Sequence, residues 1–215
     1  VVGAGPCGSY SASAAAKLGT QVIVCEEHQE IGVPIHCHGH LSLSGLEHLG
    51  LPLPARVVEN RFKGAVFCSP SGRQFTVRLT SPVTCVVNRE LFDKYLAELA
   101  MKAGVQYNLQ TRVESLALER GFVKGVVISR RGSRKTLTSG IVIDAEGVTS
   151  ALLKRTGLQT LDRSMVVNAT QAEVKRTDNL DEDTVEVYLG QRYAPGLFAW
   201  IIPKPDGSAK TGLAT

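Results

Sequence analysis

The sequence predicts an α/β fold in which a parallel βαβ unit is joined to a part built of antiparallel strands. Two observations support this prediction. Residues 1–8 place a G-x-G-x-x-G run directly after two valines, and an alanine-rich helical segment, a second apolar strand and the acid Glu26 follow it. From Met165 onwards, apolar and polar residues alternate in long strand-like segments separated by turn residues.

Each glycine of the run has its own expected role. Gly3 permits the tight turn after the first strand, Gly5 lets a pyrophosphate approach the backbone, and Gly8 lets the helix pack closely on the strand. The helix directs its first N–H groups and the positive end of its dipole towards the phosphates. Glu26 stands near the position of the acid that accepts hydrogen bonds from a ribose, and it disfavours a 2′-phosphate. The pattern predicts a Rossmann-like dinucleotide site, with a structural turn that binds no ligand as the alternative.

Composition and charge exclude several other classes of protein. The chain is 43% hydrophobic with a mean hydropathy of +0.02 and a formal net charge of +4. No apolar run reaches the length of a membrane span and no basic leader is present, so we expect a globular cytoplasmic protein. The densest basic run, residues 130–135, lies between strand-like segments, which favours a hairpin turn over a nucleic-acid surface. Five widely spaced cysteines without a C-x-x-C pair indicate free thiols in a reducing compartment.

The ends of the chain suggest a piece of a longer polypeptide. Buried strands usually run about 5 to 6 residues, yet only Val1 and Val2 precede Gly3, and the chain stops within a strand-like segment. We therefore expect further C-terminal residues in the whole protein.

The first half of the chain alternates between helical and strand signals. In order, we expect a loop over 27–42, a short helix over 45–50, a hairpin over 61–77, a strand over 82–87 and a helix over 89–104. The hairpin interrupts the βαβ pattern and should belong to a separate sheet. The positive charge of Arg89, in the first turn of its helix, is unfavourable near the positive end of the helix dipole unless an anion binds beside it. The residues alone leave open whether Arg89 contacts a cofactor phosphate or ribose or is an ordinary surface arginine.

The second half reads mainly as strands. We expect a strand over 105–111, a meander over 112–129, a buried strand over 137–143 that ends in an acid and a glycine turn, and strands over 166–174, 184–189, 197–203 and 210–214. The change in composition places a domain boundary near residue 160.

With these segments in view, the chain resembles the geranylgeranyl reductase family of flavoproteins, within the larger group shaped like p-hydroxybenzoate hydroxylase. The glycine run, Glu26, the helix start at 88–93 and the segment 144–147 are similar to FAD-binding elements that hydroxylases and reductases share. Two motifs are narrower. Ile31-Gly32-x-Pro34-x-x-Cys37 is similar to the reductase segment that sets a cysteine beside the isoalloxazine ring. Residues 198–203, followed after eight residues by Gly212, are similar to the Y-x-W-x-F-P…G-x-G substrate motif.

The chain departs from the family pattern at several positions. Phe198 stands where the family usually has Tyr, Ile202 where it has Phe, and Ala214 where it has the last Gly. The residues 38–40, His-Gly-His, replace the small, glycine-rich residues that usually follow the cysteine. The later G-D-A-A-G segment, which contacts the flavin, is absent, and this fits truncation.

The resemblance implies the domain organisation. It predicts a Rossmann-like FAD-binding domain of the glutathione reductase type, with a parallel sheet and a β-meander, over residues 1–60 and 80–160. An antiparallel-sheet substrate domain, with its C-terminal part missing, is expected over residues 61–79 and 161–215.

The activity implied by the resemblance is reduction of isolated C=C bonds in a prenyl chain, with tightly but non-covalently bound FAD and with NAD(P)H or ferredoxin as electron donor. Reduced FAD delivers a hydride to one alkene carbon, and the protein must bring a proton to the other.

Cys37 is the expected catalytic residue, as proton donor or as a contact that orders the flavin. Phe198, Trp200 and Pro203 are expected to line an apolar slot for the substrate. On residue type alone, Cys37 is also compatible with a small buried residue, and Trp200 with strand core.

The cofactor-binding residues implied by the resemblance come from both halves of the chain. They are Gly3, Gly5, Pro6, Cys7, Gly8, Glu26, Glu27, Cys37, His38, His40, Arg89, Val113, Asp144 and Gly147.

Five histidines fall between residues 28 and 48. In an extended segment His36, His38 and His40 would share one side, with Cys37 opposite, which suggests a zinc or iron site. The spacing brings no fourth ligand and the family needs no metal, so we expect none. His38 and His40 are instead expected at the flavin or at the mouth of the site.

Three functions remain open from the sequence. The first is a prenyl reductase acting on a geranylgeranyl lipid or a chlorophyll-type precursor, with the electron donor and a peripheral contact to the membrane as further partners and no nucleic acid. The second is an FAD-dependent monooxygenase that hydroxylates an aromatic ring or an alkene on the same fold. The third is a flavin-binding electron-transfer protein without a substrate of its own.

Overall fold

A computed structural model describes residues 1–160, 162–175 and 179–215. The chain forms two compact units, one made of Val1–Ile35 and Glu90–Arg163 and the other of His36–Arg89 and Ser164–Thr215. Residues 36–60 and 80–89, which the sequence analysis grouped with the FAD-binding domain, thus belong to the second compact unit. Residue 161, the expected start of the second substrate segment, lies outside the described residues. The assignment of a flavin domain and a substrate domain stays a prediction.

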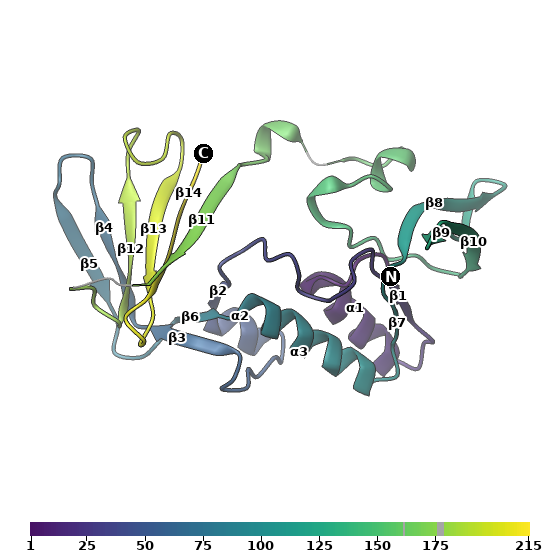
Figure 1. Ribbon diagram of the computed structural model, residues 1–215, viewed down its shortest axis with the longest axis horizontal. Helices are drawn as coiled ribbons and strands as arrows, with labels where there is room; N and C mark the ends of the chain where they lie inside the picture. Colours follow the sequence, from purple (N-terminus) through teal and green to yellow (C-terminus); the bar gives the residue numbers. More distant parts are fainter. Residues whose placement is uncertain (161, 176–178) are drawn as a thin grey trace. The chain divides into compact units, whose positions relative to one another are not determined.

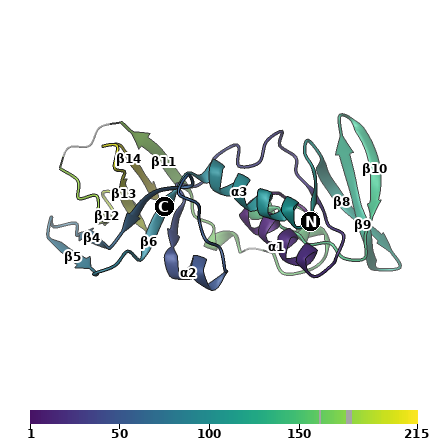
Figure 2. The same cartoon turned by 90° about the horizontal axis from the view of Figure 1, so that it is seen from below.

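The centre of the first unit is a small parallel layer with two helices (Figure 1). It contains α1 (Pro6–Lys17), β1 (Ile23–Cys25), α3 (Arg89–Lys102) and β7 (Gln106–Asn108), and β1 pairs in parallel with β7. Val2 bridges Cys25 and Asp144, also in parallel. The helices lie side by side in Figures 1 and 2, where Ala12 of α1 and Ala100 of α3 share a buried cluster with Val24. Small side chains on both helices permit this close packing.

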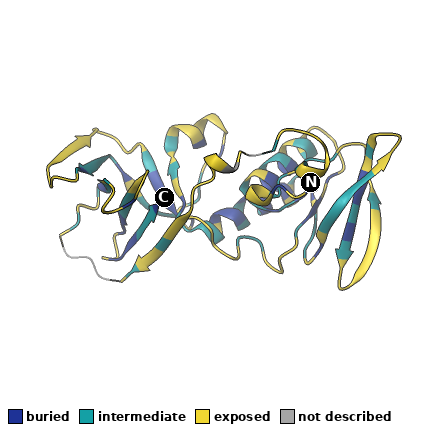
Figure 3. Cartoon of the chain, turned by 90° about the horizontal axis from the view of Figure 1, so that it is seen from above, coloured by how far each residue is buried: buried dark blue, intermediate teal, exposed yellow. Residues whose placement is uncertain are grey.

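The expected meander follows the parallel layer. Strands β8 (Arg112–Glu119), β9 (Phe122–Arg130) and β10 (Ser133–Thr138) form an antiparallel sheet in the order β10-β9-β8. The basic run makes the β9–β10 turn, where Arg131 and Gly132 have φ of 51° and 79°, as a two-residue hairpin turn requires. Ile128 is buried on β9, whereas the outer strand β10 is mostly exposed, as Figure 3 shows.

The strand expected at 137–143 is wrong. After β10 the chain continues without regular structure, Ile141 is 80% exposed, and only Asp144 bridges the neighbouring segment. Each of the residues 139–143 is exposed or only partly buried, so this apolar run lacks the enclosed surroundings that the prediction assumed. Three short 3₁₀ helices follow, η1 (Gly147–Thr149), η2 (Leu153–Arg155) and η3 (Arg163–Met165).

The described residues of the second unit form two sheets and the α-helix α2 (Leu43–His48). The three-stranded sheet has the order β2 (His40–Ser42), β6 (Thr84–Val87), β3 (Val58–Phe62), and α2 follows β2. The six-stranded sheet has the order β11 (Ala169–Val174), β14 (Ala209–Ala214), β13 (Phe198–Pro203), β12 (Thr184–Leu189), β4 (Gly64–Cys68), β5 (Gln74–Arg78). It is antiparallel except for the parallel pair β12–β4. The hairpin β4–β5 therefore belongs to a sheet separate from the parallel layer, as expected.

A buried cluster joins the two sheets of this unit. Phe62, Val86, Val185 and Ile202 form it, and Trp200 packs against its edge. Among the described residues, no helix has the length and apolar character needed to cross a bilayer.

Candidate functional site

The glycine turn between residues 3 and 8 is fixed by close backbone packing. Gly3 has φ of +92°, and a Cβ there would lie 2.5 Å from the carbonyl oxygen of Ala145. A Cβ on Gly8 would lie 1.9 Å from the carbonyl oxygen of Gly3, whereas a Cβ on Gly5 would meet nothing within 4 Å. The structure thus has the turn, the open approach and the close helix packing that the sequence assigned to Gly3, Gly5 and Gly8.

The start of α1 is open to an anion. Gly5 is the N-cap and Pro6 stands in the first turn, with no side chain capping the helix. The N–H of Ser9 bonds to the carbonyl oxygen of Gly5, so the N–H groups of Cys7 and Gly8 precede the first intrahelical bond. These two donors, together with the helix dipole, suit a phosphate group.

Glu26 is tied to the glycine turn. Its Oε2 accepts a hydrogen bond from the backbone N–H of Ala4 at 2.7 Å, and its Oε1 accepts one from the N–H of His28 at 2.9 Å. The His28 ring lies 2.6 Å from the same Oε1, and the Glu26 side chain is only 12% exposed. An ionised carboxylate has about four acceptor positions, so Glu26 keeps capacity for a ligand hydroxyl.

The segment 144–147 lies beside the glycine turn because Val2 bridges Asp144. Asp144 accepts a hydrogen bond from the N–H of Glu146 at 3.1 Å, and Gly147 has φ of +75°. Glu146, which belongs to the predicted segment but was not among the predicted contacts, accepts the N–H of Leu152 at 2.7 Å with its carboxylate and so holds the following 3₁₀ turn. Only its place in the same acidic turn could have indicated it.

Three further predicted residues, Glu27, Val113 and Arg89, differ in their surroundings. Glu27 forms an exposed ion pair with Arg112, at 3.7 Å. Val113 on β8 packs against the buried cluster that contains Val2 and Ile128. Arg89, in the second unit, is the first residue of α3 and is partly buried.

Cys37 is exposed, so the alternative of a small buried residue is wrong. The backbone N–H of Gly39 donates to its Sγ at 3.3 Å. Gly39 has φ of +76°, and a Cβ there would lie 2.7 Å from the carbonyl oxygen of Val87. Glycine is therefore required at the position where the Cys37 segment meets β6.

The two histidines after Cys37 bond to protein groups. His38 Nδ1 accepts a hydrogen bond from Nε1 of Trp200 at 3.3 Å, and the two rings meet edge-on. Burial and the charge of Lys210 lower the pKa of His38 to about 4. His40 Nε2 lies 2.8 Å from the hydroxyl of Thr84, and burial lowers the pKa of His40. In the described part of the chain no group of three or more His, Cys, Asp or Glu side chains could hold a metal ion.

Lys210 on β14 is a residue that the sequence analysis missed. Its ammonium group donates to the carbonyl oxygens of His38 at 3.2 Å and Val87 at 3.1 Å, and it pairs with the carboxylate of Glu59. The Lys210 side chain is only 8% exposed. In the sequence Lys210 is only a lysine in an alternating strand. This pattern does not indicate that its ammonium group bonds to residues as distant in sequence as His38, Glu59 and Val87.

The predicted substrate residues of β13 divide between its two faces. Phe198 and Trp200 share one face, with ring centroids 6.0 Å apart, whereas Pro203 lies on the other face and is buried. Gly212 is paired with Trp200, and a Cβ on Gly212 would lie 2.5 Å from Cζ2 of the indole. The indole thus lies over Gly212, and Trp200 is both partly exposed and packed on the core.

The chain matches the FAD binding domain family over residues 1–209. It belongs to this family. It is 35% identical over 215 residues to the digeranylgeranylglycerophospholipid reductase of Methanocaldococcus jannaschii, covering 99% of this chain and 54% of that relative. The enzyme of the same name from Methanocella arvoryzae is also 35% identical, with 99% and 55% covered. The chain thus spans about half the length of these curated relatives.

Solved structures agree with this FAD-binding fold. A geranylgeranyl bacteriochlorophyll reductase-like protein from Thermoplasma acidophilum is 30% identical, with a TM-score of 0.92 over 100% of this chain and 55% of that protein. The flavin-dependent brominase Bmp2, in a triple mutant, has a TM-score of 0.80 at 21% identity, with 99% and 55% covered, which shows the fold alone. The predicted fold class and the resemblance to geranylgeranyl reductases are confirmed.

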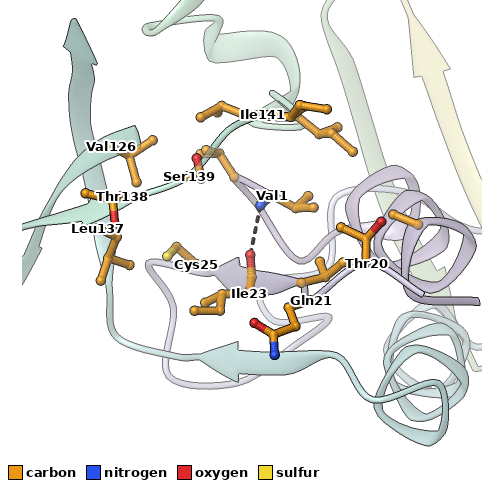
Figure 4. Close-up of a pocket in the computed structure, with 15 residues that line it drawn as sticks. Val1, Thr20, Gln21, Ile23, Cys25, Val126, Leu137, Thr138, Ser139 and Ile141 are labelled. Atoms are coloured by element: carbon orange, nitrogen blue, oxygen red, sulfur yellow. Dashed lines mark hydrogen bonds between the residues drawn. The ribbon is translucent and has the colours of Figure 1, made fainter. Parts of the chain in front are cut away.

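A separate cavity of about 230 Å³ does not belong to the FAD elements. Figure 4 shows it between β1, Val126 of β9, the end of β10 and the segment 139–143, next to the hydrogen bond from the Val1 nitrogen to the carbonyl oxygen of Ile23. Its lining is mainly apolar, and none of the predicted site residues contributes to it.

Proposed function

We propose that the protein containing this chain is an FAD-dependent reductase that saturates C=C bonds of a geranylgeranyl or similar prenyl lipid. The observation that carries the proposal is the 35% identity, over 99% of the chain, to relatives named digeranylgeranylglycerophospholipid reductase. The likeness to the Thermoplasma acidophilum protein, named for geranylgeranyl bacteriochlorophyll reductase, supports the same substrate class.

The residues of the first unit fit an FAD. The open space at Gly5 and the N–H groups of Cys7 and Gly8, which precede the first intrahelical bond, suit a pyrophosphate. The remaining acceptor positions of Glu26 suit a ribose hydroxyl. When bound and reduced, FAD supplies the hydride for the alkene. The full set of proposed contacts is Gly3, Gly5, Pro6, Cys7, Gly8, Glu26, Glu27, Cys37, His38, His40, Arg89, Val113, Asp144 and Gly147.

Cys37 is the proposed proton source or flavin-ordering contact. Its exposure lets the thiol reach a ligand. Sγ accepts a hydrogen bond from the backbone N–H of Gly39. This bond holds the thiol in one direction, which suits a contact that orders the flavin.

Phe198 and Trp200 are the proposed wall of the prenyl slot, because they present adjacent aromatic rings on one face of β13. Pro203, the third proposed residue, shapes the end of that strand from its other face.

We further propose NAD(P)H or ferredoxin as the electron donor, a cytoplasmic location, and peripheral contact with the membrane that holds the lipid.

The deciding experiment is anaerobic. The full-length, FAD-loaded protein is reduced with dithionite and mixed with a geranylgeranyl lipid, while flavin absorbance and product mass are followed. Reoxidation of the flavin with gain of a hydrogen pair per double bond supports the reductase, and Cys37→Ala should slow this step. If the flavin is reoxidised only after oxygen is admitted and the product is hydroxylated, the protein is a monooxygenase instead. Absence of any substrate reaction would favour an electron-transfer protein.

A further inference from the structure

His38 connects the segment that carries Cys37 to the strand that carries Trp200. We propose that His38 is a positioning residue whose uncharged imidazole accepts the indole N–H of Trp200 and thereby fixes the orientation of the indole on the substrate wall. The bond joins Nε1 of Trp200 to Nδ1 of His38 at 3.3 Å. Its role in substrate binding rests on the function proposed above, whereas the bond itself does not.

The hydrogen bond between the two rings determines which nitrogen of the His38 imidazole carries its proton. An indole nitrogen can only donate a hydrogen bond, so Nδ1 of His38 must carry a lone pair and the imidazole proton must be on Nε2. The imidazolium form has two donors and no acceptor. Protonation of His38 therefore breaks the bond to Trp200.

The charged groups around His38 favour the uncharged ring. Lys210 on β14 bonds to the carbonyl oxygen of His38, and its charge acts with burial to hold the pKa of the ring low. Glu173 on β11 acts in the opposite direction. Glu59 on β3 and Lys204 after β13 pair with Lys210 and Glu173 respectively, and so reduce the net effect of both. Burial and the charge of Lys210 lower the pKa of His38 by more than the charge of Glu173 raises it.

Trp200 also packs against the buried cluster of Phe62, Val86, Val185 and Ile202, but the bond to His38 is the hydrogen bond that the described structure gives to its indole N–H. The indole lies over Gly212, which offers a flat surface without a side chain, and its edge faces Phe198. Neither contact is directional, because neither contains a hydrogen bond. An indole N–H turned away from His38 towards the apolar cluster would lose its acceptor, which is costly for a buried donor. His38 thus selects one orientation of the ring.

The orientation matters because a prenyl chain offers only apolar surface to the protein. The shape of an aromatic wall then decides where along the chain a double bond comes to rest. We expect His38→Leu to raise KM for the prenyl lipid about fivefold, the effect of losing one hydrogen bond, with a smaller change in kcat. His38→Asn should restore KM, because Oδ1 of asparagine occupies the place of Nδ1 and can accept the same N–H.

Fluorescence tests the bond without any turnover. Excitation where tyrosine does not absorb selects tryptophan emission, and subtracting the emission of a Trp200→Phe variant of the same protein isolates the signal of Trp200. In the wild type, emission should stay constant through neutral pH and change with a midpoint near 4. His38→Asn should abolish this midpoint, since asparagine does not titrate. His40→Leu, the matched control on the same segment, should retain it.

Two results would overturn the proposal. If the acid midpoint persists in His38→Asn, another group reports on Trp200 and the bond is not the determinant. If the bond is verified by fluorescence but His38→Leu binds the prenyl lipid as tightly as the wild type does, the positioning role is wrong. A protein that reduces no prenyl chain at all would contradict the proposed function, while the fluorescence result would still decide the bond.

Discussion

The glycine turn of residues 3–8 and the segment of residues 37–40 are both candidate cofactor-binding regions, but they are held in different ways. Gly3 and Gly8 are fixed by contact with backbone atoms, with Glu26 bonding across the turn from 22 positions away. Segment 37–40 is held by Trp200 and Lys210, which are 162 and 172 positions from His38. Steric exclusion makes the first region intolerant of added atoms, whereas polar bonds make the second sensitive to charge.

The largest effect is expected from Gly8→Ala. The added Cβ would meet the carbonyl oxygen of Gly3 at 1.9 Å, and because both partners are backbone, α1 must move. We expect the free energy of unfolding to fall by about 3 kcal/mol, measured by urea denaturation, with loss of FAD binding.

Gly5→Ala is the matched control for this substitution. Gly5 has φ of −66° and open space around it, so stability should change by less than about 0.5 kcal/mol. FAD affinity should nevertheless fall, because the methyl group blocks the approach to the helix start. Equal stability losses in the two variants would contradict the steric account.

Lys210→Met tests the anchor of the second region. The substitution leaves Glu59 and the carbonyl oxygens of His38 and Val87 without the ammonium group. We expect a loss of about 2 kcal/mol in the free energy of unfolding, because one partner of a largely buried pair is removed while Glu59 keeps Lys204 at 3.9 Å. The double variant with Glu59→Gln should recover part of this loss, and urea denaturation measures both. A loss below about 0.5 kcal/mol in the single variant would show that Lys210 is not an anchor.

The charge sensitivity of segment 37–40 should appear as a pH dependence of stability. The pKa of His38 is about 4 in the folded chain and 6.5 in the reference state, so between these values the unfolded chain binds more protons. The free energy of unfolding should therefore fall as the pH drops from about 6.5 to about 4, without a further contribution from His38 below that range. Denaturation at a series of pH values measures the slope. His38→Asn should reduce it, and an unchanged slope would contradict the assignment.

The smallest effect is expected from Glu27→Gln. Glu27 pairs with Arg112 at 3.7 Å, and both side chains are more than half exposed. Such pairs contribute less than about 0.5 kcal/mol. Urea denaturation should therefore show nearly wild-type stability, and a loss above about 1 kcal/mol would indicate a role in the glycine turn that the exposed geometry does not provide.

The comparison also explains what the sequence could predict. The roles of Gly3, Gly5 and Gly8 follow from the local spacing of the glycine run, and the constraint on Gly8 is itself local because it comes from Gly3. The contact of Gly3 with the carbonyl oxygen of Ala145 became apparent only from the fold. The hairpin turn at Arg131 and Gly132, in contrast, was predictable from its local sequence.

The errors and omissions have a non-local origin. The apolar run at 137–143 reads as a buried strand, but its residues 139–143 form no strand and are exposed or only partly buried, which local apolar character does not reveal. Lys210 was missed because no local pattern identifies carbonyl oxygens that lie 123 and 172 positions away as its partners. His38 was expected at the flavin, and its bond to Trp200 became apparent only from the fold.

The distance in sequence between His38 and Lys210 has a consequence for biosynthesis. A ribosome makes the chain from the N-terminus, so Glu26 can bond to Ala4 early, as soon as the first βαβ segment has emerged. The carbonyl oxygen of His38 must wait for β14, which is synthesised 172 residues later. At about 5 to 20 residues per second, that interval is roughly 10 to 30 seconds. During it the segment of Cys37 can pair with β6 through Gly39 and His40 but lacks its bonds to Trp200 and Lys210, and chaperones or cellular oxidants have longer access to its thiol.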